Sequence, residues 1–345
     1  MQTIRLGSRE VGPRRPAYII AEMACAHDGD PGKALRLVEA AATTGADAVQ
    51  LQFFSREHQV TPDHPAYATL QRIAFSREQW APIVAAARAT GLDVLACTFD
   101  VPSARMALEF RVDGIKLNSS DLSNPDLLEL VAASGTPFTL GTGASTVEEI
   151  SAAVLAAERH APVHMVLMHG VQNFPTAIAH AHIRRVGLLQ GMFGYPVGYA
   201  DHTDGSLPES PLMDLLALGA GACVLEKHYT LSRAEKGVDY QAALEPAEFV
   251  RYVQLVRTAE AALGPGRCMP LSDADRSYRQ FQKKSIVAAR DLAAGEVLTR
   301  DMVEFMRTSG DPGLPPVAWP ELAGQALARP VARYAQVRRE HLGSH

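Results

Sequence analysis

Short runs of apolar residues, many of them β-branched, alternate with longer helical patterns over the first 230 positions of the chain. The short runs are continuously apolar instead of alternating, which is typical of parallel strands buried on both faces. The sequence therefore predicts eight parallel strands. They cover residues 17–24, 48–54, 94–100, 114–119, 138–143, 163–170, 197–203 and 222–230.

The segments between these runs carry signals for the two ends of a helix. Asp30 followed by Pro31 predicts a helix start, because aspartate caps the first turn and proline suits its geometry. Ser76 with Gln79 predicts a capping box before another helix. Glycine is favoured just beyond a helix, so we expect helices to end near three glycines. These are Gly91, Gly135 and Gly219.

Eight strand–helix units in roughly 250 residues predict an α/β fold of the (β/α)8 TIM-barrel type. A doubly wound open sheet is the competing architecture, but it usually has a glycine-rich first turn, and the turn ACAHDG lacks that pattern. We expect the barrel to span 1–263, with its last helix starting near 246. A polar linker follows over 264–283, and a small module with two strands occupies 284–345.

Composition narrows the class of protein. The chain of 345 residues is 47% hydrophobic and 21% charged, enough apolar material for a sizeable core. A net charge of −5 and a pI near 6.2 give no electrostatic case for nucleic-acid binding, although local cations could still hold a small anion. The start, MQTIRLGSREVG, lacks the apolar core of a signal peptide, and no run approaches a membrane span. We therefore expect a cytoplasmic protein.

The four cysteines show no CxxC spacing. Cys97 and Cys223 fall in apolar strand runs, where cysteine usually acts as a small buried hydrophobe. The sequence thus predicts neither a disulfide framework nor a cysteine zinc site.

Polar residues stand at the end of every predicted strand, where TIM-barrel enzymes carry their active sites. Strand ends border solvent, so Thr98, Thr142 and His169 taken singly need no functional explanation. Glu22 and Lys116 do need one, because ionisable groups at these positions are costly to bury without a task.

His202 and His228 end two consecutive predicted strands, in the segments GYADHT and CVLEKHYT. A lone histidine of this kind is usually only a hydrogen-bonded rim residue. Two imidazoles at the same end of one sheet favour a divalent metal site of the Mn, Fe, Co or Zn type. Lys116 is suited to holding a carboxylate or phosphate, or to pairing with a neighbouring acid. The pattern leaves His27 open as a ligand, a general acid or a plain loop residue.

Beyond these patterns, the chain resembles the sialic acid synthases, meaning N-acetylneuraminate synthase with its legionaminate and pseudaminate relatives. IIAEMACAHDG resembles the opening IAEIGxNHxG, and GIKLNSSDLSNPDLL resembles KIxSxExxNxxLL. HGVQNFPT, GYADHT and EKHYTL resemble HCTSxYPT, GYSDHT and EKHFTL. The module SIVAARDLAAGEVLTRDMVEFMR resembles the family's C-terminal antifreeze-like (SAF, β-clip) domain. The resemblance runs along nearly the whole chain and identifies a divergent member.

The resemblance implies a carbon–carbon bond-forming transferase. Phosphoenolpyruvate would condense with an N-acetylmannosamine-like aldehyde sugar, or an unusual acceptor, to give a 2-keto-3-deoxy sugar acid and phosphate. It also implies a divalent metal on His202 and His228, Mn²⁺ before Mg²⁺ or Co²⁺. Glu22 would position or deprotonate a reacting hydroxyl or water, while Lys116 and Ser119 would hold the donor.

The same resemblance implies sugar contacts from Gln52, Asp121 and Asp239. Arg307 matches the arginine that reaches the active site of a partner subunit, which implies a domain-swapped homodimer. The candidate substrate-binding residues are Gln50, Gln52, Thr98, Ser119, Asp121, Thr142, Gln172, Phe174, Asp239 and Arg307.

The chain departs from the family pattern in its expected pockets. Gln50 replaces a lysine, and Gly141 and Ala200 replace serines. Gln172 and Phe174 stand where some members have asparagine and tyrosine, and Asp121 where the family has glutamate. Losing a charge-assisted contact costs on the order of 2–3 kcal/mol, so donor binding would weaken unless another residue compensates.

Three hypotheses follow for function. The first is a synthase that uses phosphoenolpyruvate and an unusual sugar or aldehyde. The second is a metal-dependent aldolase, lyase or epimerase that no longer uses phosphoenolpyruvate, suggested by Gln50, Gly141 and Ala200. The third is a non-catalytic sugar-binding protein, which retention of Glu22 and both histidines argues against.

Overall fold

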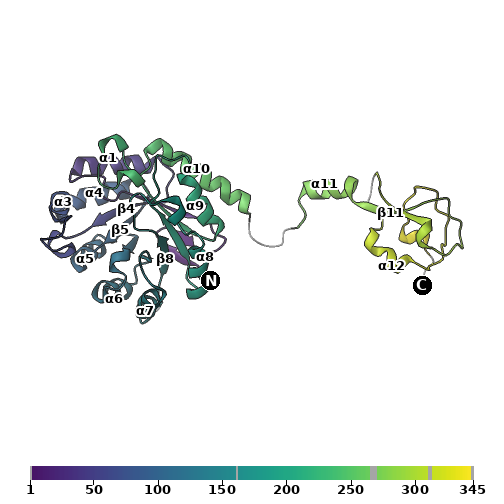
Figure 1. Cartoon of the computed structure of the whole chain (residues 1–345), viewed down its shortest axis with the longest axis horizontal. Coiled ribbons are helices and arrows are strands. Elements are labelled where there is room, and N and C mark those ends of the chain that lie inside the picture. Colours follow the sequence, from purple (N-terminus) through teal and green to yellow (C-terminus); the bar gives the residue numbers. More distant parts are fainter. Residues whose placement is uncertain (1, 161, 265–269, 310–312, 343–345) are drawn as a thin grey trace. The chain divides into compact units, whose positions relative to one another are not determined.

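The computed structural model describes residues 2–160, 162–264, 270–309 and 313–342. Two compact units divide the chain, Met1–Gly266 and Arg267–His345, and each is described by itself (Figure 1). The boundary falls within the segment 264–283 that we expected to be a linker. Cys268 lies outside the described residues.

Unit 1 is a closed barrel of eight parallel strands with helices around it, which confirms the predicted TIM barrel (Figure 1). Each strand pairs with the next along the chain, and the last pairs with the first. Each of the eight predicted apolar runs overlaps one of these strands. The strands are β3 (Tyr18–Glu22), β4 (Ala48–Phe53), β5 (Asp93–Thr98), β6 (Gly114–Leu117), β7 (Phe138–Gly141), β8 (Met165–Gly170), β9 (Val197–Asp201) and β10 (Val224–His228). Only β5 begins before its run, by one residue.

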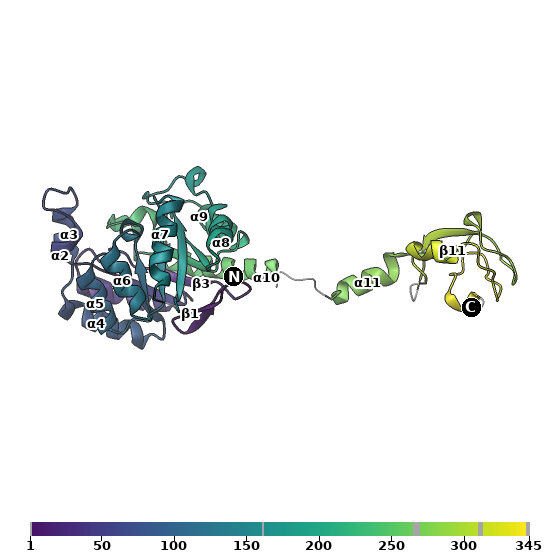
Figure 2. The ribbon, with the colours of Figure 1, turned by 90° about the horizontal axis from the view of Figure 1, so that it is seen from below.

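A short antiparallel hairpin precedes the barrel and was not predicted. It consists of β1 (Ile4–Leu6) and β2 (Arg9–Val11) (Figure 2). Its buried Ile4, Leu6 and Val11 form one cluster with inward-facing residues such as Tyr18 and Val224, at the first residues of β3 and β10. The hairpin therefore plugs the amino-terminal end of the barrel, so polar chemistry is left to the opposite end.

The helices begin as the sequence predicts. Asp30, directly before Pro31, accepts a hydrogen bond from the Gly32 amide. Ser76 forms a complete capping box with Gln79. The helices of unit 1 are α1 (Pro31–Ala42), α2 (Arg56–Gln59), α3 (Tyr67–Ile73), α4 (Arg77–Ala89), α5 (Val101–Glu109), α6 (Pro125–Ala133), α7 (Val147–Glu158), α8 (Arg185–Phe193), α9 (Ser210–Gly219) and α10 (Pro246–Leu263).

All three expected helix-ending glycines lie at helix ends. Gly91 and Gly135 follow their helices with φ of +82° and +73°, a conformation that costs glycine little. Gly219 is the last residue of α9, and the positive φ of +105° falls two residues later, at Gly221.

Unit 2 contains the two strands predicted for the small module, now β11 (Lys284–Ala288) and β12 (Val303–Arg307), paired antiparallel. It also contains α11 (Asp273–Gln282) and the short α12 (Trp319–Leu322). Ile286, Leu298 and Leu327 belong to its own buried apolar cluster. None of the helices described in either unit is long and apolar enough to cross a membrane.

Candidate active site

The carboxyl ends of three neighbouring strands bring polar side chains level with one another. In the strand register, Glu22 of β3 lies beside His228 of β10 on one side and beside Gln50 of β4 on the other. Residues in register on parallel strands point to the same face of a sheet. Glu22, Gln50 and His228 therefore bring a carboxylate, an amide and an imidazole to the barrel mouth.

A buried polar network joins Glu22 and Gln50 to Glu226 and Lys116. The Gln50 amide donates to Glu22 and also to Glu226 Oε2, the latter at 3.1 Å. The Lys116 ammonium forms an ion pair with Glu226 Oε1. Glu22 Oε1 also accepts from the Ala24 amide at 2.6 Å. Two carboxylates thus share one ammonium and one neutral amide.

Burial sets the protonation of this network. The pKa of Glu22 is raised to about 7, chiefly by burial; the Lys116 charge opposes this rise and the Glu226 charge adds to it. Burial alone would lower the pKa of Lys116, but the Glu226 and Glu22 carboxylates outweigh it and hold that pKa above its usual value. Lys116 therefore stays charged, while Glu22 exchanges its proton near neutral pH.

His202 and His228 face each other across the same mouth, with ring centroids 5.2 Å apart. His202 Nδ1–H donates to the Val171 carbonyl at 2.8 Å, which leaves Nε2 with a free lone pair. No hydrogen bond from the His228 ring is found within the described residues. Burial lowers the pKa of both imidazoles, that of His228 strongly, so both are neutral. The Phe174 ring packs on His202 with centroids 4.4 Å apart.

Glu226 completes a set of three buried groups that fits a metal ion. One ligand atom from each of His202, Glu226 and His228 lies within 4.8 Å of the other two. Two neutral imidazoles and a carboxylate suit a divalent first-row ion. Glu226 was not among the ligands predicted from the sequence. Its signal was available, because Glu226 precedes His228 by two residues and so lies on the same face of β10.

The residues behind the histidines hold the two strands together. Asp201 and Lys227, each directly before a histidine, form a fully buried ion pair. Lys227 also donates to Ser210 Oγ at 2.8 Å and lies 3.2 Å from Asp214. β9 and β10 are thereby fixed to α9, which limits the movement of His202 and His228.

Ser119 anchors a second polar group beside the mouth. Its Oγ accepts hydrogen bonds from the Gly143 amide at 3.1 Å and from the Gln172 side chain at 3.2 Å. Gly141 lies against the same residue, because a Cβ there would sit 2.6 Å from Ser119 Oγ. The glycine that departs from the family pattern is therefore required by this close approach.

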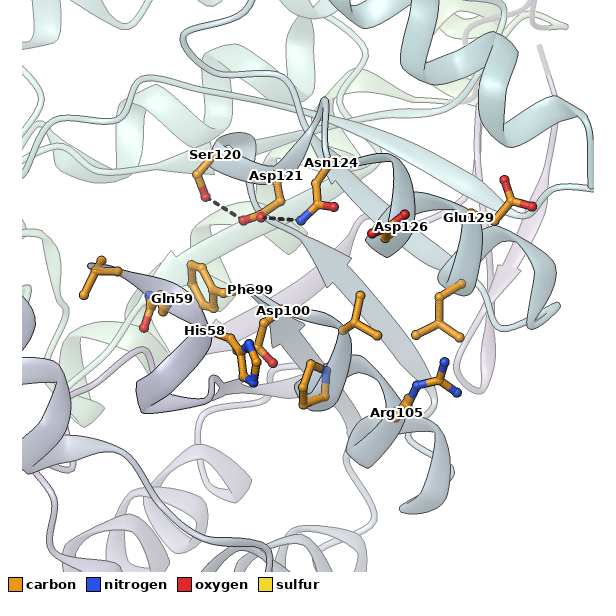
Figure 3. A pocket seen from close by; sticks show the side chains of 14 residues that line it. His58, Gln59, Phe99, Asp100, Arg105, Ser120, Asp121, Asn124, Asp126 and Glu129 are labelled. Carbon is orange, nitrogen blue, oxygen red and sulfur yellow. Dashed lines mark hydrogen bonds between the residues drawn. The ribbon is translucent and has the colours of Figure 1, made fainter. Parts of the chain in front are cut away.

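Asp121 faces a groove of about 990 Å³ beside the barrel mouth (Figure 3). Asp121 accepts from Ser120 Oγ at 2.7 Å and from Asn124 at 3.3 Å. Burial raises the pKa of Asp121. His58 and Asp100 lie across the groove from these residues in Figure 3. The structure places no hydrogen bond or ion pair between Asp121 and the histidine cluster within the described residues.

Gln52 lies near the carboxyl end of β4, and Asp239 lies in the loop that follows β10. Gln52 Oε1 accepts a hydrogen bond from the Cys25 thiol at 3.3 Å. Burial raises the pKa of Cys25, and the nearby Asp239 carboxylate also raises it. Asp239 has φ of +60°, and burial raises its pKa to about 6. Arg307 is exposed at the end of β12 in unit 2.

The remaining candidates have internal roles or none. Thr142 donates to the Met168 carbonyl at 3.0 Å, and His169 donates to the Ala181 carbonyl at 2.8 Å. The buried Thr98 hydroxyl has no partner among the described residues. His27, left open by the sequence, is fully buried against Phe75, and burial lowers its pKa to about 4. It is a packed neutral residue.

Comparison with known proteins assigns the family. Residues 37–267 match the NeuB family and residues 283–342 match the SAF domain. The chain is 32% identical over 307 residues to an uncharacterized protein of Methanocaldococcus jannaschii, covering 89% of each chain. It is 28% identical over 354 residues to the N,N'-diacetyllegionaminic acid synthase of Legionella pneumophila, covering 97% of each.

A solved structure agrees with this assignment. The N-acetylneuraminic acid synthetase of Leptospira borgpetersenii matches with a TM-score of 0.76 and 30% identity, over 81% of this chain and 96% of that one. The buried histidine–glutamate cluster therefore sits in a barrel of known enzyme type. The chain belongs to the NeuB family, the family of sialic acid-type synthases, and is an enzyme of this class that ends in a SAF domain.

Proposed function

We propose that the enzyme condenses phosphoenolpyruvate with the aldehyde of an N-acetylmannosamine-like or related sugar. The named relatives make sugar acids of this type, among them N,N'-diacetyllegionaminic acid. In the reaction, C3 of phosphoenolpyruvate bonds to the aldehyde carbon, and the aldehyde oxygen takes up a proton. Water adds at C2, and phosphate leaves as its bond to C2 breaks. The product is a 2-keto-3-deoxy sugar acid.

The observation that carries this proposal is the arrangement around Glu226. A candidate metal site of His202, Glu226 and His228 adjoins a charged lysine and a carboxylate that titrates near neutral pH. A condensation of an anionic enol ester with an aldehyde needs these three parts: charge stabilisation at the aldehyde oxygen, a cation for the donor, and a proton acceptor for water.

Each part has a proposed role. Lys116 would bind the donor's carboxylate or phosphate, with Ser119 and the Gly143 amide beside it. Glu22 would accept the proton of the attacking water. A divalent ion held by His202 and His228, most simply Mn²⁺, would supply positive charge next to the aldehyde oxygen. Phe174 would exclude water from the side of His202 that it covers.

Acceptor contacts are proposed at the rim. Gln52, Asp121 and Asp239 offer two carboxylates and an amide that can take hydroxyl groups of an open-chain sugar. Arg307 in unit 2 would complete the acceptor site of a partner subunit in a domain-swapped homodimer. The domain limits proposed for this arrangement are 1–263, 264–283 and 284–345.

A second function is favoured by one specific observation. Gln50 offers a neutral amide where the family has a lysine, so two carboxylates in the mouth share a single ammonium. This charge disfavours a donor as anionic as phosphoenolpyruvate. A metal-dependent aldolase, lyase or epimerase acting on a less charged substrate is therefore the alternative.

One experiment separates these two functions. Purified enzyme with Mn²⁺ is incubated with phosphoenolpyruvate and a panel of N-acetylated sugars, free sugars and simple aldehydes, and released phosphate is measured. We expect acceptor-dependent release with at least one sugar, lost in His228→Ala. No release with any acceptor, from protein that still binds Mn²⁺, would reject the synthase and favour the alternative.

A further inference from the structure

We propose that Glu226 is a third metal ligand and that Lys116 competes with the metal ion for it, so that metal binding releases Lys116 to the anionic donor. The proposal rests on the proposed function for the identity of the donor. Glu226, which was not predicted from the sequence, would thereby link metal binding and donor binding in one site.

The geometry of Glu226 carries the first step. Glu226 and His228 are two residues apart on β10, so both side chains point into the barrel. Ligand atoms of Glu226, His202 and His228 come within 4.8 Å of one another, and all three residues are buried. A carboxylate so close to two neutral imidazoles is drawn to any divalent ion they hold, because charge attraction is strong where water is excluded.

The partners of Glu226 carry the second step. Both of its oxygens are engaged, Oε1 by the Lys116 ammonium and Oε2 by the Gln50 amide at 3.1 Å. Lys116 is 7% exposed, so its ammonium has little contact with water and depends on this partner. A metal ion that takes Glu226 must therefore weaken the ion pair, and the freed ammonium needs a new anion.

The charge in the mouth gives the third step. Two carboxyl groups, Glu22 and Glu226, face the single ammonium of Lys116, and Gln50 adds no charge. This arrangement repels an anionic donor. A divalent ion held by His202, Glu226 and His228 would add positive charge to the mouth and would free Lys116 for the donor. Metal and donor should therefore bind cooperatively, with the metal first.

A double-mutant cycle on Mn²⁺ binding tests the competition without measuring activity. Mn²⁺ is titrated by calorimetry into wild type, Glu226→Gln, Lys116→Met and the double variant. We expect Glu226→Gln to weaken binding about 10-fold or more. Lys116→Met should tighten Mn²⁺ binding in the wild-type background. In the Glu226→Gln background the gain in affinity from Lys116→Met should be about 10-fold smaller, because residues in direct contact have coupled effects.

The outcomes distinguish this proposal from the proposed function. His228→Ala is the control that should lose Mn²⁺ in any case. If Glu226→Gln binds Mn²⁺ as tightly as wild type while His228→Ala does not, the two-histidine site stands and the third ligand is rejected. An equal gain from Lys116→Met in both backgrounds would show simple repulsion, and would reject the competition.

A second measurement does not depend on the stability of the Lys116 variant. Phosphoenolpyruvate is titrated into wild type, Glu226→Gln and Glu22→Gln in the presence of a chelator. Both variants remove one carboxylate, but only Glu226 is the ion-pair partner of Lys116. We expect Glu226→Gln to bind several-fold more tightly than Glu22→Gln. Equal affinity in the two variants would overturn the release of Lys116.

Discussion

Asp201 and Lys227 are register partners on β9 and β10, and their side chains form a fully buried ion pair on the outer face of the barrel. The next residue along the chain is in each case one of the two histidines, His202 just after β9 and His228 at the end of β10, and these point inward. Because side chains alternate along a strand, a slip of one residue would move the ion pair into the mouth and the histidines out of it. The outer pair therefore specifies the register that forms the inner site.

Replacing the lysine of this pair should cost both stability and metal affinity. Lys227→Met leaves Asp201 and Asp214 buried without their cation, which we expect to lower the free energy of unfolding by about 3–5 kcal/mol. Denaturant unfolding measures the loss, and Mn²⁺ titration its effect on the histidines. Adding Asp201→Asn and Asp214→Asn to the variant should restore part of the stability. Unchanged stability in Lys227→Met would contradict the role of the pair.

The pH dependence of the rate should report Glu22. Burial raises its pKa to about 7, so the carboxylate that accepts a proton forms only as the pH rises through this region. We expect kcat/KM to increase with pH up to about 7 and then level off, and a bound cation would move this limb to lower pH. Glu22→Gln should lower kcat about 100-fold or more and remove the limb. A limb that persists in Glu22→Gln would assign it to another group.

Restoring the family's lysine at position 50 should strengthen donor binding. Gln50→Lys places a second ammonium between Glu22 and Glu226, and a charge-assisted contact is worth about 1.5–3 kcal/mol. We expect the KM for phosphoenolpyruvate to fall roughly 10-fold. Gln50→Met, which removes the amide and adds no charge, is the control and should not lower KM. An unchanged KM in Gln50→Lys would argue that the donor does not approach this residue.

Adding a side chain at Gly141 should disturb Ser119. A Cβ at Gly141 would meet both Ser119 Oγ at 2.6 Å and the Ser119 amide nitrogen at 2.7 Å. We expect Gly141→Ala to lower stability by about 1–3 kcal/mol and to raise the donor KM. Gly187→Ala in α8, where the nearest atom is 3.6 Å away, is the matched control and should be neutral or stabilising. Thermal unfolding of both variants decides the matter.

Unit 2 should be needed for activity through Arg307. Deleting 284–345 should abolish turnover while Mn²⁺ still binds, because the candidate metal-site residues His202, Glu226 and His228 belong to unit 1. Arg307→Ala should raise the acceptor KM with little effect on thermal stability, since the side chain is exposed. Arg329→Ala, another exposed arginine of unit 2, is the control. Full activity in the truncated enzyme would remove unit 2 from the site.

Much of the site could be predicted, because in a parallel barrel the place of a residue along its strand decides which end of the barrel it occupies. A polar residue that ends a buried parallel strand must lie at one end of the barrel, so Glu22, His202 and His228 were expected together before any contact was known. Glu226 was missed because it lies two residues before the end of β10, inside an apolar run, and not at the strand end itself. The reason for Gly141 was equally hidden, since it depends on Ser119 in a neighbouring strand–loop unit.

Local sequence patterns were enough to predict the eight strands, the principal helix starts, the small carboxyl-terminal module and the two histidines of the candidate metal site. These features depend on periodicity, capping and motif spacing, which are properties of neighbouring residues. The folded chain was needed to reveal that the N-terminal hairpin plugs the barrel, that Lys227 pairs with Asp201, and that Lys116, Gln50 and Glu226 share one network. These contacts join residues distant along the chain, and their hydrogen bonds and charges become strong only once folding has excluded water from between them.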